Sequence, residues 1–372
     1  MKVLLIATVQ SHICQFHKPL VELLHENGCV VHVAARNNLA EKNGLKLDFA
    51  EKVYDLPFSR SPKSPDNIKA YKQLKKIITE NGYDVIHCNT PMGGIVTRLA
   101  AKKARKDGTK VFYTAHGFHF YKGAPLLNWM LYYPIEKIFA NMTDKLITIN
   151  EEDYRLSAAK ISKRAFKING VGVDEERFFP ADEDEIVNLR EKLKIPVDKK
   201  VILCIGELLR NKNHAMIINA MPKILKEKPN TVLLIAGNGP LREELEKLIS
   251  DLGLENSIRL LGYVTNIEEY HRACDLLAAC SIREGLGMNV IEAMMSAKPV
   301  VAADNRGHRE LVKDDFNGYI VPQNDADQMS RRIISIFADD NKYSSMAQNA
   351  RESSLKYGSK IVKEELRKIY EL

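Results

Sequence analysis

Short apolar runs alternate with segments of helical spacing along the first half of the chain. Continuous apolar runs of four to eight residues are typical of strands buried on both faces, whereas apolar positions every three or four residues indicate amphipathic helices. The alternation predicts a parallel sheet covered by helices on both sides. The predicted strands are 2–8, 29–35, 52–56, 85–88, 111–115 and 146–150, and the predicted helices are 19–27, 68–81, 94–107 and 126–141.

The alternation stops near residues 172–185 and then starts again. The acidic run Asp182-Glu183-Asp184-Glu185 lies at the break, so a linker is expected there. Two Rossmann-like, doubly wound α/β domains are therefore predicted, 1–175 and 176–354, facing each other across a cleft. The amphipathic segment at about 355–372 is expected to pack back on the first domain. In the second domain the predicted strands are 201–206, 231–237, 258–262, 276–281, 300–304 and 319–322, with helices at about 213–227, 240–252, 288–296 and 325–338.

Composition favours a protein of the cytoplasm. Of the 372 residues, 45% are hydrophobic and 28% are charged, as in ordinary globular proteins. No run approaches the roughly 20 apolar residues that cross a bilayer, and the first apolar run has no cleavage-like site after it. The six cysteines show no CxxC spacing, which favours buried, reduced thiols.

The net charge of +7 is concentrated in the first half. Residues 1–180 carry 27 Lys and Arg against 18 Asp and Glu, whereas the remainder carries 28 against 30. Such an excess can bind nucleic acid, an anionic membrane face or an acidic acceptor. Solvated helix faces explain it equally well. The basic clusters are Lys69-Lys72-Lys75-Lys76 and Lys102-Lys103-Arg105-Lys106.

A glycine-punctuated turn, Glu284-Gly285-Leu286-Gly287, lies between the predicted strand 276–281 and the predicted helix from Met288. A strand, a bare backbone turn and a helix N-terminus together make an anion site, because free N–H groups and the helix dipole point at its occupant. Glu284 and Glu292 flank this site. We interpret the occupant as a nucleotide-sugar diphosphate, with one glutamate on the sugar and the other on the ribose.

A dinucleotide-dependent oxidoreductase shares this layered architecture, but the glycine pattern disfavours it. Such an enzyme carries GxGxxG directly after its first strand. The strand 2–8 leads into a segment without glycine, and the strand 201–206 leads into a segment with Gly206 alone. Gly237-Asn238-Gly239 opens a helix but lacks the third glycine.

Three further features are candidates for chemistry, each with a structural alternative. Arg210 and Lys212 follow a strand and could offset the charge on a departing diphosphate, or they are solvated loop cations. His116 ends the strand 111–115 and, with His119, could face a sugar, or it is structural. The aromatic residues are core or line an apolar acceptor groove. They are Tyr113, Phe118, Phe120, Tyr121, Trp129, Tyr132 and Tyr133.

Metal binding is weakly supported. Asp182-Glu183-Asp184 and Asp325-Ala326-Asp327 resemble the DxD of metal-dependent glycosyltransferases. The first lies in the expected linker, and the second is expected to cap a helix.

The segment from Glu284 to Met294 resembles the EX7E segment of retaining GT-B glycosyltransferases of family 4. The resemblance covers nearly the whole chain and is strongest over 200–322. The first half is similar to bacterial capsular and exopolysaccharide members. Other motifs in the family's order are Gly206…Lys212, Ala236-Gly237-Asn238-Gly239-Pro240-Leu241, Leu261-Gly262-Tyr263-Val264, Pro299-Val300-Val301-Ala302, Arg306-Gly307…Glu310-Leu311-Val312, Asn317-Gly318-Tyr319, Asn89-Thr90-Pro91-Met92-Gly93-Gly94 and Ala115-His116-Gly117-Phe118-His119-Phe120.

The resemblance implies a role for each matched position. Glu284 would contact the donor sugar, Glu292 the ribose, Lys212 the leaving phosphate and Val264 the base. The backbone of Gly285, Leu286, Gly287, Met288 and Asn289 would hold the diphosphate. The other donor-binding positions are Gly206, Arg210, Gly237, Asn238 and Gly239.

The resemblance further implies a reaction without metal or cofactor, with retention of anomeric configuration and with His116 near the sugar. A UDP-sugar donor and a saccharide or polyprenyl-linked acceptor are expected, without nucleic acid, in the cytoplasm or at the inner face of its membrane. Two departures from the family concern phosphate binding: Glu207 stands where arginine is usual, so that Arg210 would have to substitute, and the segment after strand 2–8 lacks glycine.

Two rival functions share the scaffold. A GT-B nucleotide-sugar epimerase would release a changed nucleotide sugar without an acceptor. A non-catalytic binding subunit would keep the fold alone, although Glu284, Glu292, Lys212 and His116 argue against it.

Overall fold

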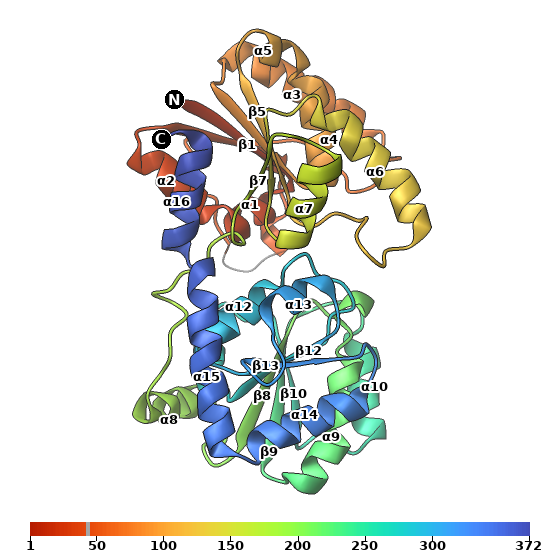
Figure 1. Ribbon diagram of the computed structural model, residues 1–372, viewed down its shortest axis with the longest axis vertical. Coiled ribbons are helices and arrows are strands. Elements are labelled where there is room, and N and C mark those ends of the chain that lie inside the picture. Colours follow the sequence, from red (N-terminus) through yellow and green to blue (C-terminus); the bar gives the residue numbers. More distant parts are fainter. Residues whose placement is uncertain (42–44) are drawn as a thin grey trace. The chain divides into compact units, whose positions relative to one another are not determined.

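The computed structural model describes residues 1–41 and 45–372, and the chain divides into two compact units (Figure 1). Unit 1 comprises Met1–Gly172 and Ser359–Leu372, and unit 2 comprises Val173–Gly358. Within the described ranges, no helix is both long enough and apolar enough to cross a lipid bilayer.

Unit 1 is built on a seven-stranded parallel sheet in the order β3-β2-β1-β4-β5-β6-β7. The central strand β1 is buried from Val3 to Val9, as the apolar run at the N-terminus predicts for a sheet with both faces covered. Sequence patterning missed only the short last strand. The strands are β1 (Lys2–Val9), β2 (Val30–Arg36), β3 (Lys52–Asp55), β4 (Val85–Asn89), β5 (Lys110–Ala115), β6 (Lys145–Thr148) and β7 (Ala165–Lys167).

The helices of unit 1 include the C-terminal helix of the chain, as expected. Its Tyr370 hydroxyl lies 2.6 Å from His87 Nδ1 on β4, and its Glu365 accepts from the Asn169 amide at 2.7 Å. The helix expected over 94–107 is two helices that meet at Ala101. The helical elements are α1 (Gln10–Phe16), α2 (Lys18–Glu26), η1 (Leu39–Glu41), α3 (Asp66–Asn81), α4 (Pro91–Ala100), α5 (Lys102–Lys106), α6 (Leu126–Ala140), α7 (Glu151–Lys160) and α16 (Ser359–Tyr370).

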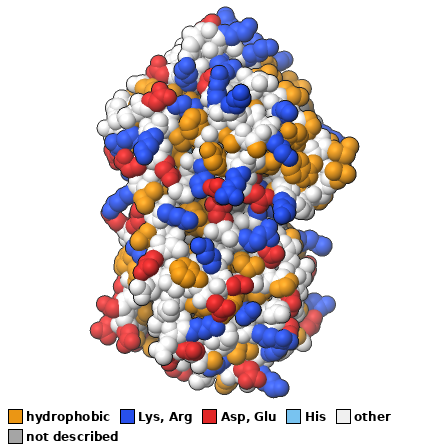
Figure 2. Space-filling model, in the orientation of Figure 1, with side chains coloured by type: hydrophobic (Ala, Val, Ile, Leu, Met, Phe, Trp, Pro, Cys, Tyr) orange, Lys and Arg blue, Asp and Glu red, His pale blue; other side chains and the backbone are white. Residues whose placement is uncertain are grey.

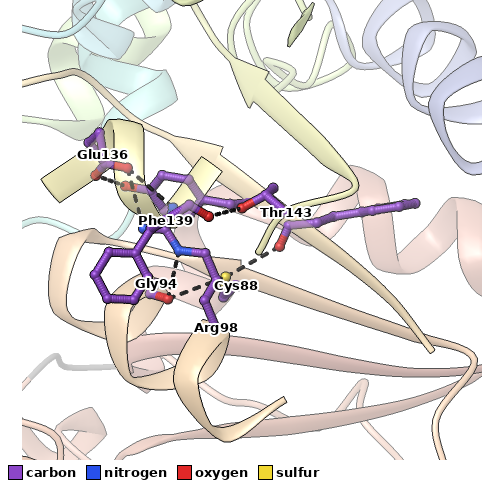
Figure 3. A network of polar contacts seen from close by, with 8 residues as sticks. Cys88, Gly94, Arg98, Glu136, Phe139 and Thr143 are labelled. Carbon is purple, nitrogen blue, oxygen red and sulfur yellow. Dashed lines mark hydrogen bonds and ion pairs between the residues drawn. The ribbon is translucent and has the colours of Figure 1, made fainter. Parts of the chain in front are cut away.

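A buried ion pair helps to anchor helix α6 to unit 1 (Figure 3). The Arg98 guanidinium is 1% exposed, and both of its terminal nitrogens donate to Glu136 Oε2 at 3.3 Å. Arg98 also donates to the Gly94 carbonyl at 3.0 Å and lies 4.1 Å from the Tyr113 ring. The Tyr113 hydroxyl donates to Glu136 Oε1, so that the helix is held by a satisfied polar network.

The aromatic residues around α6 are mostly core. Phe118 and Phe120 are buried and stacked at 4.8 Å, and Trp129 and Tyr133 pack against them. Tyr132 is the exception, because it is exposed and stacks on His119.

Unit 2 is built on a six-stranded parallel sheet in the order β10-β9-β8-β11-β12-β13. Its strands are β8 (Lys200–Ile205), β9 (Thr231–Ala236), β10 (Ile258–Gly262), β11 (Leu276–Ala279), β12 (Val300–Ala303) and β13 (Gly318–Val321). Its helical elements are α8 (Glu183–Lys192), η2 (Arg210–Lys212), α9 (Ala215–Glu227), α10 (Arg242–Asp251), α11 (Ile267–Ala273), α12 (Met288–Met295), α13 (Arg306–Leu311), α14 (Ala326–Phe337), α15 (Asp340–Ser354) and η3 (Leu355–Tyr357).

The linker expected at the acidic run 182–185 was a wrong prediction, because this run is the start of α8. Asp182 is the N-cap, and its side chain accepts from the Glu185 amide at 2.8 Å. The carboxylates of the first turn lie at the positive end of the helix dipole, which favours helix formation despite the mutual repulsion. Asp325 caps α14 in the same way, as predicted, by accepting from the Gln328 amide.

All six cysteines lie in the described ranges and are free thiols. Five are buried, and Cys14 is half-buried.

Candidate functional site

The glycine-punctuated turn of unit 2 joins β11 to the N-terminus of α12. Gly287 has φ +97° and precedes the helix, a conformation that favours glycine. The first amides of the helical ladder are those of Val290 and Ile291, which donate to the Gly287 carbonyl. The amides of Met288 and Asn289 come before that ladder and lie at the positive end of the helix. The turn therefore has the backbone geometry of an anion site.

Lys212 reaches the first carboxylate of this turn. Its Nζ lies 2.6 Å from Glu284 Oε1, and the two side chains are 26% and 18% exposed. Lys212 lies in η2, after β8, and a Cβ on Gly206 would come within 3.0 Å of its side chain. Because Gly206 has no side chain, the aliphatic part of Lys212 can pass over it. The structure brings together two residues that the sequence placed 72 positions apart.

Two hydrogen bonds join the loop after β8 to the turn after β11, and a third joins α12 to the end of β8. The Ile282 amide donates to the Asn211 carbonyl at 2.8 Å, and Asn211 Nδ2 donates to the Arg283 carbonyl at 3.1 Å. Asn289 Nδ2 on α12 donates to the Ile205 carbonyl at 3.2 Å. These bonds fix the position of Lys212 relative to the turn before any ligand arrives.

The glycines after β9 allow a close approach of backbones beside the lysine loop. A Cβ on Gly237 would lie 1.9 Å from the Gly206 carbonyl oxygen, and one on Gly239 would lie 2.6 Å from the Leu208 carbonyl oxygen. The Gly237 amide donates to the Gly262 carbonyl at 2.7 Å, just ahead of Val264 in the loop after β10. The glycine motifs of the sequence therefore line one edge of the sheet, at the carboxyl ends of β8, β9 and β10.

Two of the predicted donor-site residues lie apart from the ion pair. Glu292 is on α12, and its Oε2 lies 3.4 Å from Nε2 of the fully buried His271 on α11. The pair is an electrostatic contact without hydrogen-bond geometry. Arg210 is exposed on η2 and makes no ion pair with any described residue. Lys212, rather than Arg210, is therefore the cation brought to Glu284.

His308 is a site residue that sequence reasoning missed. It lies on α13, whose N-cap Asn305 accepts from the His308 amide at 3.0 Å. His308 Nδ1 lies 2.7 Å from the Ala303 carbonyl, which fixes that nitrogen as the donor and leaves Nε2 with a lone pair. Burial lowers the pKa of His308, and the nearby Glu284 and Lys212 act on it in opposite directions. The sequence offered one signal for this residue. His308 lies three positions after Asn305, the spacing between an N-cap residue and the third residue of a helix.

In unit 1 the predicted His116 lies at the carboxyl end of β5. Its Nε2 is 3.1 Å from Asn89 Oδ1, and Asn89, at the end of β4, donates from Nδ2 to the Ile6 carbonyl on β1. His116 Nε2 also lies 3.2 Å from His12 Nε2. Burial lowers the pKa of His116 to about 4, so the imidazole is neutral near pH 7. His12 was not expected at this site, because 104 residues separate the two histidines.

The fold and the turn define a two-domain α/β protein with a candidate anion site at the carboxyl edge of a parallel sheet. Comparison with known families gives the class. The model of "Glycosyl transferases group 1" matches residues 185–353, and that of "Glycosyl transferase 4-like" matches residues 2–150. The chain is 41% identical, over 99% of its length and 96% of the relative's, to the Bacillus subtilis protein named "Putative glycosyltransferase EpsD". The chain belongs to the group 1 glycosyltransferases and is a glycosyltransferase.

A second relative and a solved structure are similar over most of the chain. The Escherichia coli UDP-Gal:alpha-D-GlcNAc-diphosphoundecaprenol alpha-1,3-galactosyltransferase is 28% identical over 80% of this chain and 77% of its own. Anabaena HepE, solved with UDP and glucose, aligns with a TM-score of 0.80 at 21% identity and covers 100% of this chain and 99% of its own. The last likeness shows the fold, which is GT-B.

Proposed function

We propose that the protein transfers a sugar, with retention of anomeric configuration, from a UDP-sugar to a lipid-linked saccharide during synthesis of a cell-surface polysaccharide. The observation that carries the proposal is the Lys212–Glu284 ion pair beside the turn that opens α12. A cation, a carboxylate and a helix N-terminus in one place suit a substrate that combines a diphosphate with a hydroxyl-rich ring.

Each residue of the turn has a separate task in the proposed reaction. The amides at the N-terminus of α12 bind the diphosphate, whose negative charge grows as the bond to the sugar breaks. Lys212 offsets that growing charge, which stabilises the transition state more than the ground state. Glu284 accepts hydrogen bonds from the sugar hydroxyls and stabilises the positive charge on the ring, and Glu292 accepts from the ribose. No metal ion or cofactor is needed in this scheme.

The donor brings a charge that the Lys212–Glu284 pair must accommodate. In the free protein the lysine ammonium is neutralised by the carboxylate at 2.6 Å. When a diphosphate arrives, the ammonium can share its three donors between Glu284 and a phosphate oxygen. Glu284 is then still held in place by the ammonium, with its other oxygen available to the sugar.

The acceptor side is proposed to lie on unit 1. His116 is a neutral hydrogen-bonding group at the edge of its sheet and is proposed to contact the sugar. The E. coli relative is named for a diphosphoundecaprenol substrate, which supports an acceptor with a lipid anchor.

Helix α6 offers a surface that suits such an acceptor at a membrane. Its exposed apolar residues gather on the right of Figure 2, next to lysines. We propose that this face, defined as the α6 surface, inserts shallowly into an anionic bilayer, with Lys122 and Lys137 at the headgroups. Its residues are Leu126, Leu127, Met130, Leu131, Ile135 and Ile138.

The test is transfer by purified full-length protein from a panel of UDP-, GDP- and ADP-sugars to a polyprenyl-diphosphate saccharide, read by mass spectrometry. UDP-sugar should be used, and Glu284→Gln should reduce kcat by about a hundredfold or more while leaving the melting temperature unchanged. Glu244→Gln, an exposed acid on α10, is the matched control and should remain fully active. A fully active Glu284→Gln enzyme would rule out the proposed donor site. A changed nucleotide sugar in the donor-only incubation would indicate an epimerase instead.

A further inference from the structure

Three histidines of unit 1 bring one ring nitrogen each into a single cluster. The nitrogens of His12, His17 and His116 all lie within 4.8 Å of one another. His12 is on α1, directly after β1, and His17 joins α1 to α2, whereas His116 follows β5. The parallel topology places the ends of β1 and β5 at one edge of the sheet, which brings the three residues together.

The hydrogen bonds of the cluster fix where its lone pairs lie. Asn89 Nδ2 donates to the Ile6 carbonyl, so Oδ1 is the atom that faces His116 Nε2. Since Oδ1 can only accept, His116 Nε2 carries the proton. His12 Nε2, 3.2 Å from the same nitrogen, then accepts from that N–H, so its single lone pair is directed into the cluster.

His17 adds a nitrogen without a partner. The residue is 4% exposed, and its Nε2 has no hydrogen-bond partner among the described residues. A buried polar atom without a partner is costly and needs a reason. Burial also lowers the pKa of His12 and of His17 well below the ordinary value, so that the rings are neutral and able to bind a cation at neutral pH.

We propose that His12, His17 and His116 bind one divalent transition-metal ion of the Zn²⁺ class through three imidazole nitrogens, with a fourth position open. Two nitrogens on a tetrahedral zinc ion are about 3.3–3.4 Å apart, close to the 3.2 Å between His12 Nε2 and His116 Nε2. All three nitrogens lie within 4.8 Å of one another, so the nitrogen of His17 would have to move closer when the ion binds. Imidazole nitrogen is a ligand that suits zinc, copper and nickel, and calcium or magnesium would prefer oxygen.

Besides that movement of His17, metal binding requires a tautomer change in the cluster. His116 must release the Nε2 proton and hold one on Nδ1 instead, an exchange that water carries. No net proton is released, because the three rings are neutral before and after. Asn89 Oδ1, which loses the His116 N–H, lies 3.1 Å from the coordinating nitrogen and can accept from a water on the open position.

The consequence for activity rests on the proposed function. If His116 contacts the sugar through Nε2, a metal ion bound to that nitrogen prevents the contact and inhibits transfer. The site would then be a regulatory site and not part of the chemistry.

The experiment is calorimetric titration of ZnCl₂ into chelator-treated, untagged full-length protein, without nucleotide sugar. One equivalent should bind, with a heat that does not depend on the ionisation enthalpy of the buffer. His12→Gln, His17→Gln and His116→Gln should each weaken binding at least about tenfold. His25→Gln, an exposed histidine elsewhere in unit 1, and Cys14→Ser, a nearby thiol, should bind as the wild type does.

Thermal melts of each variant without metal show which variants are folded, and only the zinc affinities of folded variants are compared with that of the wild type. If His17→Gln or His116→Gln melts at a lower temperature, His12→Gln decides, because His12 is only half-buried and is not part of the hydrophobic core. The absence of saturable binding, a zinc affinity unchanged by His12→Gln, or one lost in Cys14→Ser would each overturn the site.

The transfer assay separates this inference from the proposed function. Zn²⁺ should lower the turnover of the wild type and should inhibit His12→Gln less. A protein that transfers sugar but binds no zinc refutes the metal site alone. A protein that binds one zinc through the three histidines but transfers nothing refutes the proposed function alone.

Discussion

At the scale of single residues, unit 1 keeps a cluster of neutral histidines. Burial lowers the pKa of His116 to about 4 and, with a contribution from His116, that of His87 to about 3. In the unfolded chain both would titrate near 6.5. Between these values the unfolded chain binds more protons, so the free energy of unfolding falls as the pH is lowered.

Lowering the pH from 6.5 to 5.5 should therefore cost about 1 kcal/mol for each of these histidines. Urea unfolding followed by Trp129 fluorescence measures this loss, because the single tryptophan lies in unit 1. The variant His116→Asn should lose about 1 kcal/mol less over the same interval. Equal stability of the wild type at both pH values would show that the histidines are not held neutral.

The backbone contact between Gly237 and Gly206 is a second feature of this scale. A methyl group on Gly237 would lie 1.9 Å from a carbonyl oxygen, an atom that cannot rotate away, and the residue has φ +151°. Gly237→Ala should lower the free energy of unfolding of unit 2 by about 3 kcal/mol, and with it the melting temperature. Donor binding should also weaken. Gly253→Ala is the matched control, because Gly253 also has a positive φ (+66°) but open space around it. Equal losses in the two variants would contradict the close approach.

At the scale of elements, α6 shows how a helix can be fixed to a domain while its apolar side stays exposed. Glu136 and Ala140 are its buried residues, and the Arg98–Glu136 pair supplies the anchor (Figure 3). Removing one partner of a buried ion pair costs several kcal/mol of stability, so this pair attaches the helix firmly to the domain. Leu126, Leu127 and Met130 remain 62–75% exposed, which is unusual for large apolar side chains on one helix face.

The α6 surface should therefore bind anionic vesicles. The double variant Leu127→Ser, Met130→Ser should weaken co-sedimentation with phosphatidylglycerol vesicles by at least about tenfold, because two apolar side chains no longer enter the bilayer. High salt should weaken wild-type binding through the lysines. Leu252→Ser together with Leu355→Ser, exposed leucines of unit 2, is the control and should bind normally. Binding that is unchanged in the α6 variant would exclude this face as the membrane contact.

At the scale of the whole molecule, the two repeated halves could be predicted because strand and helix periodicities alternate in each half and the alternation breaks between them. The helices and site residues that could not be predicted were missed for physical reasons. The first turns of α7 and α8 are acidic and their apolar stripes are weak, so periodicity gave no helix signal, and the run at Asp182 resembled a linker. That Lys212 and Glu284 lie at one edge of the sheet could be predicted because both residues follow strands of that sheet, whereas their direct ion pair could not. His12 and His308 could not, since only the three-dimensional fold brings each to its neighbours.

The anomeric configuration of the product shows whether transfer proceeds with retention. Transfer from an α-linked UDP-sugar to the polyprenyl-diphosphate saccharide should give an α-linked product, because Glu284 stabilises the ring cation on the donor's own face. Proton NMR of the purified product reads this from the coupling constant of the anomeric proton. An α-linked product that is absent with Glu284→Gln would support the account, and a β-linked product, or none from any UDP-sugar, would contradict it.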